Sequence, residues 1–331
     1  MRCTLCGADQ PQELCRVPED RYLKALDIVP SISVKVMCMR CGHIYGDPQL
    51  DNGEIDRLYR HLYRSSALGY TGEAAASAGL RWKQAKSQRD YAWLTRRRPR
   101  TASGTALEIG CAEGLFLSRL ATEGWRVVGI EPTLEYAAHA RDTFDLEVLE
   151  TPFEEVDFAG RRFDLVGALA VLEHAKDPVD FLSRIRTVLH PQGTVFVTVP
   201  NVLDLGDFSD DRLSSPHISL FTPDTLRRTF QRAGLVIYEM GPLGDLLAAV
   251  GQPAAGTAMA RLETEVPSAR RVRRAIAGAR ARARARRGRA KLRSAARLSL
   301  ARVIGEDRTA RLAARLRLRD ADLGSFPRGQ P

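Results

Sequence analysis

Residues 105–131 constrain the fold most, because they contain a strand, a glycine turn, a helix and a second strand that ends on an acid. An apolar run ends at Gly110, and a short turn leads into a helix expected over 115–122. The second strand, expected over 125–130, ends on Glu131, about 20 residues beyond the first glycine. This order of elements is typical of the nucleotide-binding half of a doubly wound α/β fold.

The glycine spacing in this turn distinguishes two kinds of nucleotide ligand. Dinucleotide sites use G-x-G-x-x-G, so that pyrophosphate rests on a helix N-terminus. Here Glu108 precedes Gly110, and Ala112 and Gly114 follow. The acid would repel pyrophosphate and favours a cationic ligand, while the glycines let the backbone approach a ligand closely. Glu131 can accept hydrogen bonds from both hydroxyls of a ribose. The alternative is a Rossmann-like unit that binds no ligand.

This stretch resembles the first motif of class I S-adenosylmethionine-dependent methyltransferases, acid-x-Gly-x-Gly-x-Gly, from which Ala112 departs at the middle glycine. The resemblance implies an α/β, Rossmann-like fold with a mostly parallel seven-stranded sheet, and S-adenosylmethionine as the cofactor. It also implies that Phe153, which follows a third strand expected over 146–149, contacts the adenine. The expected cofactor-binding residues are Glu108, Gly110, Cys111, Ala112, Gly114, Glu131, Phe153 and Leu169.

A second segment of the same resemblance follows a strand expected over 163–169. Residues 171–178 match the V-L-E-H-x-x-D-P segment of class I methyltransferases that act on small molecules. Reacting groups converge at the carboxyl ends of the strands in doubly wound folds. His174 is therefore a candidate general base or an orienting group for the acceptor. The alternative is that Glu173 and His174 only hold the loop together by hydrogen bonds.

Residues 216–222 carry a second candidate histidine, His217. A similar H-x-x-x-F-[ST] segment precedes a capped helix in glycan-type methyltransferases, where the histidine lies near the acceptor pocket. We expect Thr222 to cap a helix that continues over 225–233. His217 is accordingly expected to contact the substrate or to transfer a proton. The tryptophan that often precedes this histidine is absent, which leaves the acceptor's identity open.

The N-terminus carries two C-x-x-C pairs, Cys3 with Cys6 and Cys38 with Cys41. Four thiolates in two such pairs indicate a closed, structural zinc site, which a module this small needs in order to fold. The alternatives are reduced pairs or redox-active dithiols. Over residues 3–63 the pattern resembles the N-terminal zinc-binding domain of bacterial methyltransferases from sugar and glycan biosynthesis. In that group the module packs beside the catalytic domain and helps to shape the substrate entrance.

The sequence thus divides into four expected regions: a zinc-ribbon-like domain 1–48, a helical linker 49–100, a methyltransferase domain 101–243 and an Arg/Ala-rich helical extension 244–331. In the linker we expect a helix over 80–97, preceded by a flexible loop that includes the Ala-rich residues 74–78 and could act as a lid. Tyr59, Tyr63 and Tyr70 could line a substrate cleft, although packing is the alternative role.

The late part of the expected sheet is less well defined. A turn is expected at 190–193, followed by strands at 194–199 and 235–240. The family fold ends with an antiparallel strand inserted into the sheet, for which 318–326 is the one late candidate.

The charge of the chain is concentrated near its C-terminus. Residues 270–319 hold 19 Lys+Arg and 2 Asp+Glu, whereas the whole chain has a formal net charge of +10, so the remainder is acidic. Such a basic helical segment could be a solvated helix pair that covers the core, an interfacial helix on anionic lipid, or, less favoured, a nucleic-acid contact.

The chain shows no apolar run long enough to cross a membrane and no signal-peptide core, so we expect a cytoplasmic protein, with peripheral contact to the inner membrane through 270–319 as a further option. The sequence does not indicate an oligomeric state. It predicts a methyltransferase that acts on a small-molecule or glycan acceptor by O- or C-methylation. The alternative is a methyltransferase-like binding protein that the basic segment tethers to membrane or nucleic acid.

Overall fold

The computed structural model describes residues 1–59, 73–97, 103–204, 213–254 and 269–278, together with 281, 282 and 285, and describes the backbone alone for 73–80. By its internal contacts the chain divides into two units, 1–279 and 280–331. Most of the second unit, which holds much of the basic segment, lies outside the described residues. The expectations for Tyr63 and Tyr70 also lie outside them.

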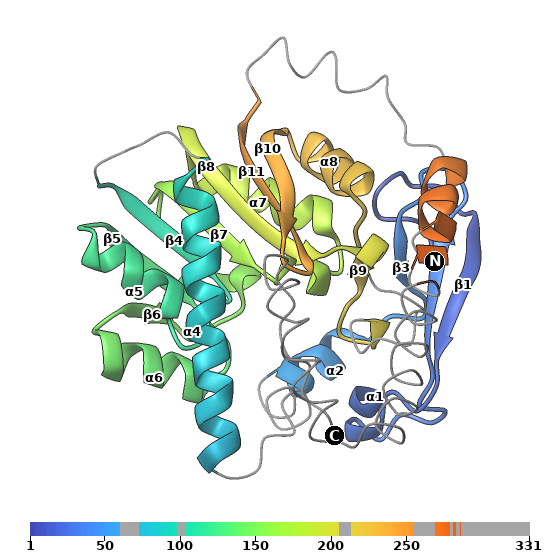
Figure 1. Ribbon diagram of the computed structural model, residues 1–331, viewed down its shortest axis with the longest axis horizontal. Helices are drawn as coiled ribbons and strands as arrows, with labels where there is room; N and C mark the ends of the chain where they lie inside the picture. Colours follow the sequence, from blue (N-terminus) through green and yellow to red (C-terminus); the bar gives the residue numbers. More distant parts are fainter. Residues whose placement is uncertain are drawn as a thin grey trace, which may run out of the picture. The chain divides into compact units, whose positions relative to one another are not determined.

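A seven-stranded sheet forms the centre of the first unit, in the order β10-β11-β8-β7-β4-β5-β6 (Figure 1). Neighbouring strands from β6 to β8 run parallel, and β11 lies antiparallel between β8 and β10. This confirms the expected Rossmann-like fold class. The strands are β4 (Thr105–Ile109), β5 (Arg126–Ile130), β6 (Glu147–Leu149), β7 (Phe163–Leu169), β8 (Leu189–Pro200), β10 (Leu235–Leu243) and β11 (Leu246–Pro253).

Helices cover both faces of this sheet, because side chains alternate between the two sides of a strand. Ala106 and Leu107, consecutive in β4, belong to two different buried clusters. The first cluster contains residues of α7 (Pro178–Val188) and α8 (Pro223–Arg232). The second contains residues of α4 (Glu73–Thr95), α5 (Leu115–Thr122) and α6 (Leu134–Phe144). The core is therefore split into two layers by the sheet.

A second, smaller sheet belongs to the N-terminal region, here called the ribbon (residues 1–48). Its antiparallel strands are β1 (Pro11–Val17), β2 (Ser33–Cys38) and β3 (Ile44–Gly46), with the short helix α1 (Arg21–Ala25) between β1 and β2. The fourth strand, β9 (Ser219–Leu220), comes from a distant part of the chain and pairs with β3. The helix α2 (Asn52–Arg57) follows the ribbon.

The helical residues 269–278 pack against the ribbon. Ala269, Val272 and Ile276 share a buried cluster with Met37 of β2 and Ile44 of β3. The contact is close where the ribbon turns after its second cysteine pair. A Cβ on Gly42 would come 2.5 Å from Cγ2 of Val272. Part of the expected C-terminal extension is thus helical, and it covers the ribbon.

The antiparallel strand inserted into the sheet lies at a different place in the sequence from the expected one, and it moves the end of the sheet beyond the expected domain boundary. The strand is β11, which pairs with β8 from Leu246 to Gly251 and with β10 along its whole length. The inserted strand is therefore not 318–326, which lie outside the described residues, and the sheet extends ten residues beyond the expected boundary at 243.

Two local expectations also need correction. The Ala-rich residues 74–78 belong to the helix α4 and do not form a loop, because alanine has the highest intrinsic helix propensity. The expected turn at 190–193 is part of β8, which begins at Leu189 opposite Phe163 and has an irregular register there.

The remaining elements of the sheet follow the expectations closely. β7 and α5 match their predicted ranges, and Thr222 caps α8 with its hydroxyl on the backbone N–H of Thr225. Among the described residues, no helix combines the length and hydropathy that a membrane span requires.

Candidate active site

The turn between β4 and α5 has a backbone shape that only certain residues adopt easily. Gly110, Ala112 and Gly114 all have positive φ, at +68°, +47° and +77°. Alanine in this region is strained by about 1–2 kcal/mol, so Ala112 is held there by its surroundings. Its backbone N–H donates a hydrogen bond of 2.9 Å to Oε2 of Glu131. The carboxylate therefore fixes the turn as well as ending β5.

Glu131 lies at the carboxyl end of β5 with both oxygens held in place. Oε2 accepts from Ala112, and Oε1 accepts from the backbone N–H of Thr133 at 2.9 Å. Glu131 is 6% exposed, and this burial raises its pKa, whereas the N–H groups of Thr133 and Ala112 and the hydroxyl of Thr133 lower it. A carboxylate has about four lone-pair sites, so acceptor capacity remains beyond these contacts. Glu131 can therefore accept a hydrogen bond from a ligand hydroxyl.

Glu108 is a second buried carboxylate, one strand away in β4. It is 4% exposed, and its Oε2 has no hydrogen-bond partner among the described residues. Burial raises its pKa well above the ordinary value, which the positive charge of Lys86 opposes. Lys86 itself donates to Asp90 at 2.6 Å. A buried carboxyl oxygen without a partner is costly, so its presence beside the turn favours a cationic ligand there.

The two glycines of the turn are required for packing inside the protein. A Cβ on Gly110 would come 2.6 Å from Cγ2 of Val171 in the loop after β7. A Cβ on Gly114 would come 2.6 Å from Cδ1 of Leu146 and 3.0 Å from Cβ of Ala140. The expectation that they make room for a ligand remains a prediction. What the structure shows is that they let the turn approach neighbouring elements.

Three other expected cofactor residues are largely enclosed. Cys111 is 4% exposed, and its sulfur would lie 2.6 Å from a Cβ on Gly129. Phe153, in the 3-10 helix η2 (Phe153–Glu155), is 3% exposed and packs edge-on against Phe181. Leu169 ends β7 and is half-buried. Contact between these side chains and a cofactor remains a prediction.

The structure brings the two candidate histidines together. His174 ends the 3-10 helix η3 (Leu172–His174), directly after β7, and its ring centroid lies 4.9 Å from that of His217 in an edge-to-face arrangement. Glu173 completes the group: one ligand atom from each of the three residues lies within 4.8 Å of the others. Such a group can hold a proton or a divalent cation.

Burial sets the charge of this group. Glu173 is 1% exposed, and burial raises its pKa to about 8, so it keeps its proton near neutral pH. Burial lowers the pKa of His174 to about 4, so its ring is neutral there. Both roles weighed from the sequence stay predictions: Oε2 of Glu173 has no hydrogen-bond partner among the described residues, whereas His174 makes a hydrogen bond to the loop at Pro216.

The contacts of His174 assign its tautomer. Its Nδ1 lies 2.9 Å from the backbone oxygen of Pro216, which can only accept a hydrogen bond. Nδ1 must therefore carry the hydrogen, and Nε2 carries the lone pair. The hydroxyl of Tyr59 lies 2.6 Å from the same Nδ1. His174 is thus positioned by a carbonyl and a phenol and directs its basic nitrogen elsewhere.

Two contributors to this site were not identified from the sequence. Tyr59 was expected only as a general cleft residue, and the backbone oxygen of Pro216 has no sequence signal. The spacing of Tyr59 from His174, 115 residues along the chain, gives no reason to link them. The proline before His217 was visible, but its role depends on how the two loops meet.

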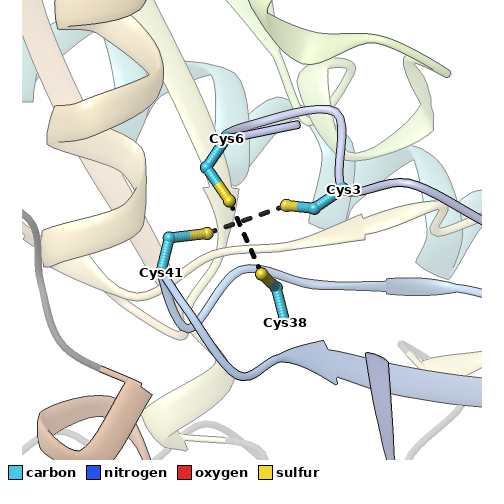
Figure 2. A group of neighbouring side chains, drawn as sticks. All are labelled: Cys3, Cys6, Cys38 and Cys41. Carbon is cyan, nitrogen blue, oxygen red and sulfur yellow. Dashed lines mark hydrogen bonds between the residues drawn. The ribbon is translucent and has the colours of Figure 1, made fainter. Parts of the chain in front are cut away.

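The four N-terminal cysteines form a second site (Figure 2). Their side chains point toward one another from two turns, with Sγ–Sγ distances of 3.7 Å for Cys3 and Cys41 and 3.5 Å for Cys6 and Cys38. Tetrahedral zinc with Zn–S bonds of about 2.3 Å places sulfurs about 3.8 Å apart, so this set of thiols fits the metal. No disulfide joins any of the six cysteines.

Comparison with known proteins finds methyltransferases, whose fold agrees with the seven-stranded sheet described above. Residues 82–240 match the family described as "Methyltransferase domain". The chain is 30% identical over 154 residues to a ubiquinone biosynthesis O-methyltransferase of Rhodopseudomonas palustris, covering 41% of this chain and 60% of that relative. It is 27% identical over 173 residues to a probable S-adenosylmethionine-dependent methyltransferase of Mycolicibacterium smegmatis, covering 52% and 67% of the two chains.

Among solved structures, the methyltransferase CalO1 of calicheamicin biosynthesis, in its SAH-bound form, is similar at 22% identity. The match covers 55% of this chain and 57% of that one, with a TM-score of 0.42. The curated relatives are matched over only part of their own length, which is 60% for the relative from Rhodopseudomonas palustris. The family match spans the chain from α4 into β10.

Proposed function

We propose that this protein, which contains a class I S-adenosylmethionine-dependent methyltransferase domain, transfers a methyl group to a hydroxyl oxygen of a small molecule. The observation that carries the proposal is the pair of buried carboxylates at the ends of β4 and β5. Glu131 keeps acceptor capacity beyond its bonds to Ala112 and Thr133, and the buried Oε2 of Glu108 has no partner among the described residues.

These residues fit the cofactor in two ways. The remaining acceptor capacity of Glu131 suits the hydroxyls of a ribose. The positive charge of the methionine end would lower the raised pKa of Glu108, whose buried Oε2 has no partner among the described residues. When bound, S-adenosylmethionine supplies an activated methyl group for an in-line displacement.

The protein's own contribution to the chemistry is positioning and removal of one proton. His174 is neutral at pH 7 and has its lone pair on Nε2, since Nδ1 donates to Pro216. We assign His174 as the base that would take the acceptor's hydroxyl proton as the oxygen displaces sulfur from the methyl carbon. His217, in edge contact with it, is assigned to acceptor binding.

The acceptor class follows from two kinds of likeness. Relatives named as ubiquinone biosynthesis O-methyltransferases favour oxygen as the methylated atom. The ribbon's resemblance to the zinc domain of glycan-modifying methyltransferases favours a sugar hydroxyl. We therefore propose an O-methyltransferase whose acceptor is a sugar, a glycan precursor or a phenol. The cysteine cluster would hold zinc in a structural role, because all four thiols are used and none is left for a substrate.

The basic segment 270–319 remains a proposed contact with an anionic membrane surface. A cytoplasmic location likewise remains a prediction.

The test of this proposal is calorimetric titration with S-adenosylhomocysteine. Glu131→Ala removes the proposed hydrogen bonds of a charged group to the ribose, so we expect affinity to fall by about tenfold to a hundredfold. Glu135→Ala is the matched control, because Glu135 is an exposed acid in the first turn of α6. Equal affinities for wild type and Glu131→Ala would reject the cofactor assignment. In a separate experiment, mass spectrometry of a strain that lacks the gene would identify the acceptor as a metabolite that is smaller than the normal product by one CH₂.

A further inference from the structure

Lys35, in the middle of β2 of the ribbon, is an unusual residue for its surroundings. It is 0% exposed, and its burial lowers its pKa to about 8. Lysine is almost never fully buried unless its charge has partners. Its position in a strand of a small sheet gives no folding advantage over an apolar residue, so its partners should explain its presence.

The partners of Lys35 are two backbone oxygens from the loop before β9. Nζ donates to the oxygen of His217 at 2.7 Å and to the oxygen of Ser214 at 3.1 Å. Both contacts span about half of the chain, with sequence separations of 182 and 179 residues. The lysine therefore joins the ribbon to the residues on either side of Pro216.

The same loop receives further contacts from the ribbon. Asp20, which is 2% exposed and caps α1, accepts from the backbone N–H of Ser215 at 2.6 Å. Gly46 donates its N–H to the oxygen of Ile218 at 2.9 Å. The pairing of β9 with β3 follows immediately. The ribbon thus holds residues 214–220 at several positions, and Lys35 contributes a cation to these contacts.

This loop carries both groups that shape the proposed acceptor site. His217 is one of them, and the oxygen of Pro216, which fixes Nδ1 of His174, is the other. A displacement of the loop would change the ring contact of the two histidines and the hydrogen bond that sets the tautomer of His174. The ribbon can therefore affect the site without contributing a side chain to it.

We propose that Lys35 is a positioning residue of the acceptor site, which fixes the loop 214–218 through the oxygens of Ser214 and His217 and thereby the geometry of His217 and His174. The part concerning acceptor binding rests on the proposed function. The part concerning loop geometry does not, and it is measured separately.

The test compares Lys35→Met with Lys24→Met, whose lysine is exposed in α1 of the same ribbon. Methionine has a similar length and no donor, so the two hydrogen bonds are lost while the core stays filled. We expect amide hydrogen exchange over residues 213–220 to become about tenfold faster in Lys35→Met only. We also expect the ring nitrogen signals of His174 and His217 in ¹⁵N spectra to shift in that variant only.

Exchange rates and histidine signals that match the wild type in Lys35→Met would overturn the proposal. If that variant does not fold, Ser215→Ala provides the second test, since it removes the hydroxyl bond to Asp20 from the same loop. We expect smaller shifts of the same histidine signals, and unchanged signals would again reject the idea. Binding of S-adenosylhomocysteine should stay unchanged in every variant. If the wild type itself does not bind S-adenosylhomocysteine, the proposed function is refuted, whereas the measurement on the loop stays valid.

Discussion

Substitution of Gly110 by alanine should destabilise the protein through one specific neighbour. The residue has φ of +68°, which costs an alanine about 1–2 kcal/mol. Its new Cβ would lie 2.6 Å from Cγ2 of Val171, and overpacking of this kind costs about 1–3 kcal/mol. The two effects together predict a loss of about 2–5 kcal/mol in the free energy of unfolding.

The second effect can be separated from the first with a double substitution. Val171→Ala removes Cγ2, so the clash disappears while the backbone strain at position 110 remains. Gly110→Ala combined with Val171→Ala should therefore be more stable than the sum of the single changes predicts, by about 1–3 kcal/mol. Urea unfolding of the four proteins, followed by tryptophan fluorescence and far-UV circular dichroism, measures this coupling.

Additive free energies would refute the reasoning, because they would show that Val171 does not limit the space at Gly110. A matched control is Gly124→Ala, whose glycine also has positive φ, at +84°, but whose Cβ would meet nothing within 4 Å. Its cost should be limited to the backbone strain of about 1–2 kcal/mol. Because the loop after β7 leads to His174, the clash should also shift the ring signals of that histidine.

Three further outcomes are expected. Elemental analysis should find one zinc per chain, and Cys38→Ser or a chelator should remove it and lower the melting temperature, whereas metal-free native protein would exclude the site. Thr222→Ala should cost about 1 kcal/mol by removing the cap of α8, a loss that Thr222→Ser should largely avoid. Lys35 has a pKa of about 8, below its ordinary value, so its contribution to stability is fully present above the unfolded pKa and is lost as pH falls toward 8. Wild-type stability should therefore rise between about pH 8 and 10.4 relative to that of Lys35→Met, and parallel pH profiles would contradict this.

The elements that sequence reasoning located best are those whose own residues determine them. β7 is mostly apolar, with Asp164 as its one charged residue, and α8 has its cap and a proline at its first position. The first turn was recognised from its glycines and acids. In these cases local pattern and tertiary environment require the same structure.

The elements that were misplaced depend on distant partners. β11 begins with Leu246-Leu247-Ala248-Ala249, a composition that suits a helix, and it becomes a strand because β8 and β10 flank it. β9 has only two residues and shows no periodicity at all. The link between Lys35 and the histidine loop joins positions more than half the chain apart, so it was not visible in the spacing of motifs.

The pairing of β9 with β3 has a consequence for attempts to treat the two regions as interchangeable parts. A fragment that ends at residue 48 would leave the hydrogen-bonding edge of β3 uncovered, and exposed edges of this kind promote aggregation. The complementary fragment would lose the partner strand that aligns its histidine loop. Grafting this ribbon onto another enzyme would therefore require residues 214–220 to be transferred with it.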